Sequence, residues 1–162
     1  MALKAIHTIG HHGPRRGFSS ILLPVNTAQP ELPCDMLDLA ARLATERRSA
    51  IVLLAFTEIP LWEEMDVELP EIDERVQQMA KQARAIAGRY GVGVHVIAPR
   101  TRGPADMILT EAQRRKAELI MLGATSPSRS AISALLRDPV ARRVAEHRGL
   151  RTMFVKPPEA AA

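Results

Sequence analysis

Few residues in this chain have the type and spacing that metal binding or catalysis requires. Three histidines, His7, His11 and His12, lie near the start, and imidazole is a common metal ligand. No cysteine or carboxylate stands beside them to complete a coordination shell, so we expect no metal site. Cys34 comes just before a predicted helix, a position that can activate a thiol. No histidine or second cysteine is placed by the sequence to use it.

Several enzyme classes are excluded because their motifs are missing. The sequence has no G-x-S-x-G elbow, and no S-G-G-x-D-S loop follows the first predicted strand, as a pyrophosphatase-type ATP site requires. His11-His12-Gly13 does not match the H-x-G-H of nucleotidyltransferases, and it lies before that strand. We therefore assign no catalytic residue.

The stretch 102–125, RGPADMILTEAQRRKAELIMLGAT, is the most informative part of the chain. Gly103-Pro104 is a typical helix start. Apolar residues then recur every three or four positions, at Ala105, Ile108, Leu109 and Ala112. The short apolar run Leu119–Leu122 does not alternate, which predicts a strand covered on both faces. Gly123 ends this strand, at the edge where open α/β sheets bind ligands.

The rest of the chain repeats this alternation of helices and strands. Asp35 and Asp138 are predicted N-caps, and Gly91 and Gly149 are predicted helix stops. The predicted strands are Ser20–Asn26, Ala50–Phe56, Val92–Ala98 and Leu150–Val155, and the predicted helices run from Asp35 to Arg47, from Glu71 to Tyr90 and from Pro139 to Gly149.

The order of these elements predicts the fold class. Because crossovers between parallel strands are right-handed, this order predicts an α/β fold. We expect a three-layer α/β/α sandwich around a five-stranded, mostly parallel, Rossmann-like sheet. Pro24 is unusual inside the first strand, because proline cannot donate to a central ladder. It therefore marks the end of the strand or a position whose N–H would point away from its neighbour.

Composition sets the broad class. The 162 residues include 25% charged residues, which suits one compact domain at residues 19–157, with a flexible extension at 1–18 and a tail at 158–162. Aromatic residues make up 3%, and the net charge of +4 is not gathered into a block, so we expect no nucleic-acid binding. No apolar run is long enough for membrane insertion. Cys34 is the only cysteine, which indicates a reducing, cytoplasmic compartment.

Taken in order, several pieces of the chain resemble the universal stress protein family, from about residue 19 to residue 157. The similar pieces are ILLPVN and IVLLAF for the family's first two strands, the stretch 102–125 for its third helix and fourth strand, LRDPVARRV for the next helix region, and RTMFVK for the closing strand. The resemblance implies a Rossmann-like domain of the adenine nucleotide alpha hydrolase type.

The resemblance also implies an altered phosphate loop. In nucleotide-binding members, a loop of pattern G-x-x-G, about nine residues, then G-S/T cradles the phosphates with backbone N–H groups. Gly123 matches the first glycine, but the second falls on Ser126, and the final pair falls on Asp138-Pro139 if two residues are inserted in the loop. An aspartate repels phosphate and a proline has no N–H, so the usual ATP phosphate-loop pattern is degraded.

Other candidate residues follow from the same resemblance. Asn26 takes the place of the family's adenine-side aspartate, and Phe56 takes the place whose backbone meets adenine. Arg137 and three residues of the loop before it could offer replacement donors to an anion, although a solvated loop explains them equally well. The candidate nucleotide-binding residues are Asn26, Phe56, Gly123, Ser126, Ser128, Arg129 and Ser130.

Alternative functions stay open. The first is a stress-response regulatory or binding module without catalysis, which the resemblance implies is a homodimer through the last strand (Arg151 to Val155). The second binds ATP or another adenine nucleotide, with magnesium, at Asn26, Phe56 and Gly123, and hydrolyses it slowly or autophosphorylates. A third is a regulatory domain that partners a membrane transporter. The long acidic loop at residues 57–70 is a candidate surface for a protein partner.

Overall fold

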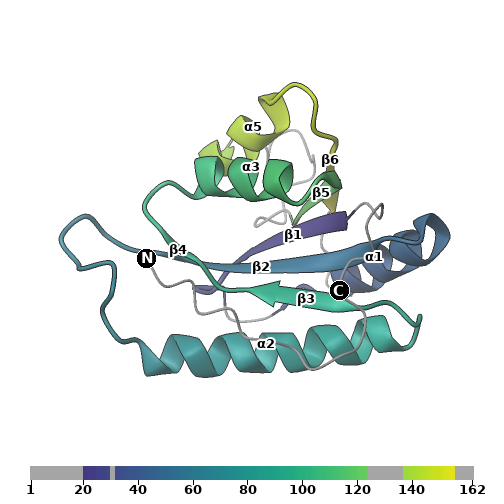
Figure 1. The fold of residues 1–162 in the computed structure, drawn as a ribbon. Coiled ribbons are helices and arrows are strands. Elements are labelled where there is room, and N and C mark those ends of the chain that lie inside the picture. The colour runs from purple at the N-terminus through teal and green to yellow at the C-terminus, as the bar shows by residue number, and fades with distance from the viewer. Residues whose placement is uncertain (1–19, 30–31, 124–136, 156–162) are drawn as a thin grey trace, which may run out of the picture.

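The computed structural model describes residues 20–29, 32–123 and 137–155, and Figure 1 shows their arrangement. Strands and helices alternate along the chain. The elements are β1 (Ser20–Asn26), α1 (Cys34–Arg47), β2 (Ala50–Glu58), α2 (Pro70–Gly88), β3 (Val94–Ile97), β4 (Arg100–Thr101), α3 (Pro104–Arg114), β5 (Ala117–Gly123), α5 (Pro139–Glu146) and β6 (Thr152–Val155).

The strands of the sheet run parallel in the order β3-β2-β1-β5-β6. β1 is therefore central, and the direction of the connections reverses between β1 and β5. β1 pairs with β2 along its whole length, from Ser20↔Ala50 to Asn26↔Phe56. The predicted five-stranded parallel sheet is confirmed, and the two-residue β4 adds a short pairing at the end of β2.

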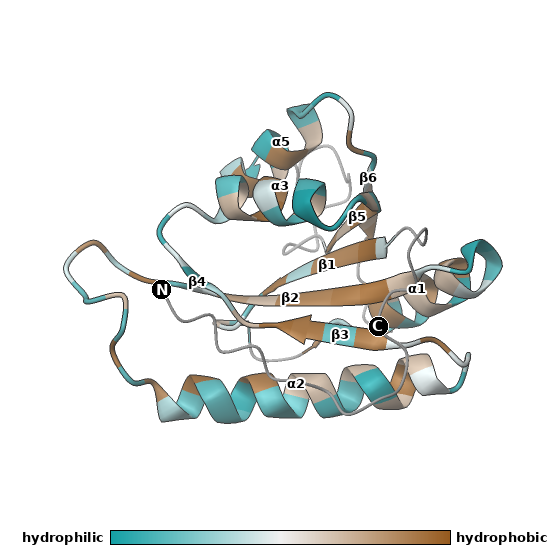
Figure 2. Cartoon of the chain, viewed as in Figure 1, coloured by the Kyte–Doolittle hydropathy of each residue, from teal (hydrophilic) through white to brown (hydrophobic). Residues whose placement is uncertain are grey.

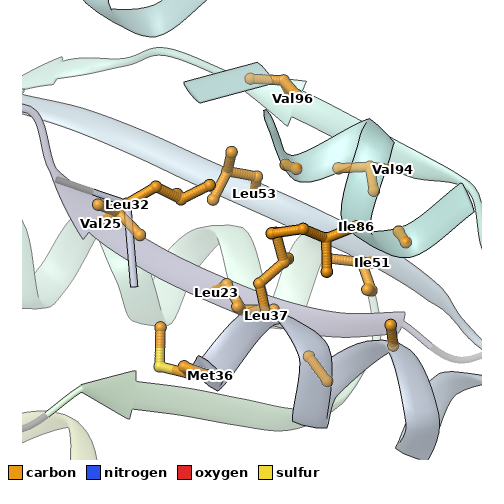
Figure 3. Packing of buried hydrophobic residues seen from close by; sticks show 14 of the residues in the cluster. Leu23, Val25, Leu32, Met36, Leu37, Ile51, Leu53, Ile86, Val94 and Val96 are labelled. Carbon is orange, nitrogen blue, oxygen red and sulfur yellow. The ribbon is translucent and has the colours of Figure 1, made fainter. Parts of the chain in front are cut away.

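Helices cover both faces of the sheet, as predicted. α1 and α2 lie on one face, and α3 and α5 lie on the other (Figure 1). Successive strand residues alternate between the two faces, so Leu23 and Leu53 belong to the cluster under α1 and α2 (Figure 3), whereas Leu22 and Leu54 belong to the cluster under α3 and α5. Apolar colour accordingly runs along β1 and β2 in Figure 2, because both of their faces are buried.

α2 confirms the predicted helical periodicity. Its buried residues are Val76, Met79, Ala80, Ala83, Ile86 and Ala87, which repeat every three or four positions. The helix begins at Pro70, where a missing N–H removes no bond, and ends at Gly88. The predicted end at Tyr90 is wrong, because Tyr90 lies in a turn that Gly91 completes with a φ of +68°.

The two predicted N-caps differ in outcome. The Asp138 side chain caps α5, accepting from the N–H of Val140 at 2.9 Å and of Ala141 at 3.3 Å. The predicted cap by Asp35 is wrong. α1 begins one residue earlier with Pro33 at the N-cap position, and no side chain makes a cap hydrogen bond there. Asp35 lies in the first turn, where its charge complements the helix dipole.

Strand ends also differ from the predicted ones. β2 continues past Phe56 to Glu58, and β3 and β6 are shorter than predicted. The extension of β2 has long-range causes, since the Thr57 N–H donates to the Pro99 carbonyl and the Ile59 N–H donates to the Thr101 carbonyl, each at 2.9 Å. The acidic loop therefore starts at Ile59.

Pro24 lies inside β1, opposite Leu54 of β2. The Thr27 N–H donates to the Phe56 carbonyl at 2.9 Å, and backbone groups alternate along a strand, so the ring nitrogen of Pro24 points toward β5. The prediction that Pro24 marks the end of the strand is wrong, because β1 continues to Asn26. The alternative, a nitrogen that points away from its neighbour, is wrong as well. β1 pairs with β5 only from Ser20 to Leu22, and this pairing stops short of their carboxyl ends.

Hydrogen bonds between side chains join α1 to the turn after α2. Tyr90 Oη donates to Asp38 Oδ1 at 2.6 Å, and Arg42 Nη2 donates to Asp38 Oδ2 at 2.6 Å. The Tyr90 hydrogen bond, followed by that of Arg42, holds the pKa of Asp38 below its ordinary value of 3.8. Because this folded-state pKa is lowered, ionised Asp38 stabilises the fold above the ordinary pKa. That contribution is lost as the pH falls through the lowered pKa.

We expect Tyr90→Phe to move the pKa of Asp38 back toward its ordinary value, because it removes the largest cause of the shift. NMR titration of the carboxyl carbon measures this directly. In urea unfolding, the variant should be less stable than wild type at neutral pH, and the difference should shrink as the pH falls below 3.8. In an Asp38→Asn background the same substitution should have an effect that does not depend on pH in this range. An unchanged Asp38 pKa would show that the hydrogen bond from Tyr90 to Asp38 does not cause the shift.

Candidate functional site

A cleft of about 620 Å³ opens at the carboxyl ends of β1 and β2. Its volume is typical of small-molecule sites. It lies next to the point where the sheet connections reverse, which is where open α/β sheets bind ligands. The lining residues are Asn26, Thr27, Ala28, Thr57, Glu58, Ile59, Pro60, Leu61, Trp62, Ile72 and Arg102.

Asn26 brings the first polar side chain to the end of β1, after a buried run at residues 21–25. Its Oδ1 accepts from the Ala28 N–H at 2.9 Å, and its carbonyl accepts from the Gln29 N–H at 3.0 Å. These bonds turn the chain out of the sheet. Within the described residues the Asn26 amide nitrogen has no hydrogen-bond partner, so its two N–H groups are available to a ligand.

Two threonines lie side by side at the ends of β1 and β2. The hydroxyls of Thr27 and Thr57 are 2.8 Å apart, so one donates to the other. Arg75 Nη1 donates to the Thr27 carbonyl at 2.6 Å, which ties α2 to the cleft. Phe56 is not a lining residue. Its ring is 7% exposed and belongs to the cluster under α3 and α5, and its carbonyl accepts from the Thr27 N–H.

The loop after β2 carries the apolar wall of the cleft. The Glu63 N–H donates to the Pro60 carbonyl at 3.1 Å, which closes a turn with Leu61 and Trp62 at its centre. Arg102 Nη2 donates to the Glu63 carbonyl at 2.6 Å and so joins this turn to the segment before α3. Figure 1 shows the loop extending from β2 before the chain returns to α2.

A second arginine holds the following part of this loop. Arg100, in β4, donates through Nη1 to the Met65 carbonyl at 3.2 Å and also to the Val67 carbonyl. Arg100 and Arg102 therefore satisfy carbonyl groups that have no strand or helix partner. The acidic loop is thus fixed by long-range hydrogen bonds from β4 and the residue that follows it.

Gly123 ends β5, on the other side of β1 from β2. It is exposed, and a Cβ added there would lie 3.7 Å from Met36 Sδ, an ordinary contact. The described structure therefore does not itself require a glycine at this position. Gly123 does not line the cleft.

The rim of the cleft is acidic. Residues 58–74 include no lysine or arginine. Their exposed acidic side chains are Glu58, Glu63, Glu64, Asp66, Glu68, Glu71, Asp73 and Glu74. Such a concentration of carboxylates repels polyanions, and Arg102 is the one cation among the described lining residues. The protein partner expected at this loop stays a prediction.

The predicted site residues are only partly brought together. Asn26 lines the cleft, Phe56 is buried in the cluster under α3 and α5, and Gly123 ends a different strand. Ser126, Ser128, Arg129 and Ser130 lie outside the described residues. Sequence reasoning missed the lining residues Thr27, Thr57, Glu58, Trp62 and Arg102. The polar pairs Asn26-Thr27 and Thr57-Glu58, each directly after a buried apolar run, were the signal that could have identified the first three.

Within the described ranges, no group of three or more histidine, cysteine, aspartate or glutamate side chains is arranged to hold a metal ion. Likewise, none of the helices described combines the length and apolar composition that crossing a bilayer requires. His7, His11 and His12 lie outside these ranges.

Solved structures share this fold. A universal stress protein from Archaeoglobus fulgidus superposes with a TM-score of 0.65 at 18% identity, covering 86% of this chain and 94% of that one. A universal stress protein from Archaeoglobus fulgidus in complex with dAMP superposes with a TM-score of 0.63 at 17% identity, covering 86% of this chain and 98% of that one. A universal stress protein in complex with cAMP gives 0.61 at 16% identity, again with 86% and 98% covered. No curated protein sequence matches the chain.

These likenesses are too distant in sequence to show more than the fold. The sequence model of the universal stress protein family, however, matches residues 10–156. This match covers all the described strands and helices. The chain therefore belongs to the universal stress protein family.

Proposed function

We propose that this chain is a stress-response regulatory module that binds an adenine nucleotide with a single phosphate in the cleft and does not catalyse a reaction on it. The observation that carries the proposal is the amphipathic lining. Polar groups of Asn26, Thr27 and Thr57 lie along one part of the cleft, and the apolar side chains of Leu61 and Trp62 lie along another. A nucleoside has this combination, because its base has apolar faces and its edges and sugar are polar. The dAMP and cAMP bound by two structural relatives support the same ligand class.

The charges favour one phosphate over three. With two residues inserted in the loop, the resemblance aligns Asp138 and Pro139 with the glycine and hydroxyl residue of nucleotide-binding family members. The Asp138 carboxylate accepts from the Val140 and Ala141 N–H groups, which places a negative charge at the helix N-terminus that would otherwise attract phosphate. The acidic rim adds repulsion that grows with ligand charge. Together these features oppose a bound triphosphate, with or without magnesium.

The lining also argues against catalysis. Among the described lining residues, only Glu58 and Arg102 are ionisable. In the part of the chain that the structure describes, the cleft lining has no histidine, cysteine or lysine to activate a threonine hydroxyl as a nucleophile. The alternative of slow ATP hydrolysis or autophosphorylation therefore has no described chemical group to support it. The single cysteine supports a reducing, cytoplasmic location.

Calorimetric titration with adenosine, AMP, dAMP, cAMP, ADP and ATP, with and without magnesium, tests the proposal. We expect AMP-class ligands to bind and ATP to bind more weakly. Asn26→Ala should weaken AMP binding roughly threefold to tenfold, because it removes hydrogen bonds to the ligand. Asn26→Asp retains an oxygen for the turn to Ala28 but has no N–H group to donate, so it should weaken AMP binding at least as much as Asn26→Ala does. Gln82→Ala, on the exposed face of α2, is the matched control. Absence of binding by every nucleotide would refute the proposal.

Asp138→Ser should raise the affinity for ATP more than the affinity for AMP. Serine preserves a helix cap, with only a small effect on stability, but removes the negative charge. The readout is the ratio of the ATP and AMP dissociation constants, which we expect to change several-fold and to depend on salt. A ratio that is the same in wild type and variant would show that Asp138 does not exclude the triphosphate.

We also propose that the chain forms a homodimer through β6. This strand is at the edge of the sheet, and its four residues are partly exposed. The Ile120 N–H donates to the Arg151 carbonyl at 2.8 Å, so by strand alternation the backbone groups of Thr152 and Phe154 point away from β5. An unpaired edge of this kind can pair with a second copy.

Thr152→Pro should weaken the dimer, because it removes an outward-pointing N–H without touching the ladder between β5 and β6. Thr152→Val keeps that N–H and is the matched control. Light scattering over a dilution series measures the dimer dissociation constant, and circular dichroism checks that both variants are folded. Equal dimerisation by a folded Thr152→Pro would place the interface elsewhere.

A further inference from the structure

We propose that the turn Pro60–Glu63 is an aromatic clamp, in which the indole of Trp62 stacks on the base of the bound nucleotide and selects purines over pyrimidines. The clamp rests on the proposed function, since it acts at the same cleft. It assigns to the loop a role in ligand specificity. Arg102 is a positioning residue that holds the turn.

The first support is the exposure of the turn. Large apolar side chains are normally buried, but Leu61 is 81% exposed and Trp62 is 85% exposed. With Val67 at 36%, these are the exposed large apolar residues of the described chain, and all three belong to the loop between β2 and α2. Leu61 and Trp62 line the cleft, whereas Val67 does not. Apolar surface in this position is well placed to be covered by a ligand in the cleft.

The second support is that the turn is fixed in advance. The Glu63 N–H donates to the Pro60 carbonyl at 3.1 Å, and Arg102 Nη2 donates to the Glu63 carbonyl at 2.6 Å. The Ile59 N–H anchors the start of the turn to the Thr101 carbonyl at 2.9 Å. An aromatic ring on a fixed turn loses little conformational entropy when it binds, so more of the stacking energy appears as affinity.

The third support is the division of the cleft into a stacking part and a polar part. Trp62 offers a large aromatic face, which is an efficient platform for a nucleobase. Asn26 offers N–H donors and Glu58 offers a carboxylate acceptor in the same cleft, and these suit the acceptor nitrogens and the amino group of an adenine edge. A two-ring purine covers more of the indole than a one-ring pyrimidine, so the stacking favours purines.

Trp62 is the only tryptophan, which gives the clamp a direct readout. We expect AMP to change the intrinsic fluorescence of the wild-type protein with the same dissociation constant that calorimetry measures. Trp62→Ala should weaken AMP binding about tenfold or more, as the loss of base stacking predicts, and should lower the ratio of AMP to CMP affinity. Trp62→Phe should retain most of the AMP affinity and most of the preference for AMP over CMP. Val67→Ala, on the same loop and outside the cleft, should leave the AMP affinity and this preference unchanged.

The role of Arg102 is tested separately in the ligand-free protein. Arg102→Gln should lower the fluorescence anisotropy of Trp62, because the turn loses its hydrogen bond to the Glu63 carbonyl and the indole moves more freely. It should also weaken AMP binding without changing thermal unfolding by more than a few degrees. Unchanged anisotropy would remove Arg102 from the clamp.

The outcomes separate the clamp from the function on which it rests. If AMP binds but Trp62→Ala binds it equally well, with the same preference over CMP, the clamp is wrong and the proposed function stands. The exposed turn would then be free for a protein partner. If wild type binds no nucleotide, both proposals fail together.

Discussion

The structure depends on one constraint, which is the position of β1. β1 pairs with β2 along its whole length and with β5 from Ser20 to Leu22, and helices cover both faces of the sheet, so its residues from Ile21 to Val25 are buried. A strand in that setting can carry only apolar side chains without leaving polar groups unsatisfied. Polar side chains therefore follow the buried run, at Asn26 and Thr27, and Thr27, which is itself buried, shares a hydrogen bond with the Thr57 hydroxyl. The neighbouring β2 follows the same rule, with Thr57 and Glu58 after its own buried run.

Sequence reasoning recovered the parts of the fold that depend on local patterns. The periodicity of α2, the buried run of β5 and the Asp138 cap are each encoded within a few consecutive residues. The missed features depend on residues that are distant in the chain. β2 extends to Glu58 because Pro99 and Thr101 accept its N–H groups. The turn at Trp62 holds its shape because Arg102, 39 positions after Glu63, donates to the Glu63 carbonyl, and Arg100 donates to the Met65 carbonyl further along the loop. No window of neighbouring residues contains that information, which is why the apolar wall of the cleft was not predicted.

The candidate site is thus assembled from two kinds of contribution. The strand ends supply a polar edge whose geometry follows from the sheet. The loop after β2 supplies side chains whose positions depend on a few arginine contacts, and such contacts are easily altered by substitution. Loops positioned by a rigid scaffold are in general the more variable part of a site.

Pro24 has a consequence for the hydrogen-bond ladder between β1 and β5. Its ring nitrogen has no hydrogen to donate, and the two strands pair only from Ser20 to Leu22. No rearrangement of the surrounding helices can supply the missing donor. The early end of this pairing is therefore set by the covalent structure of the chain, and it holds in every state in which the sheet exists.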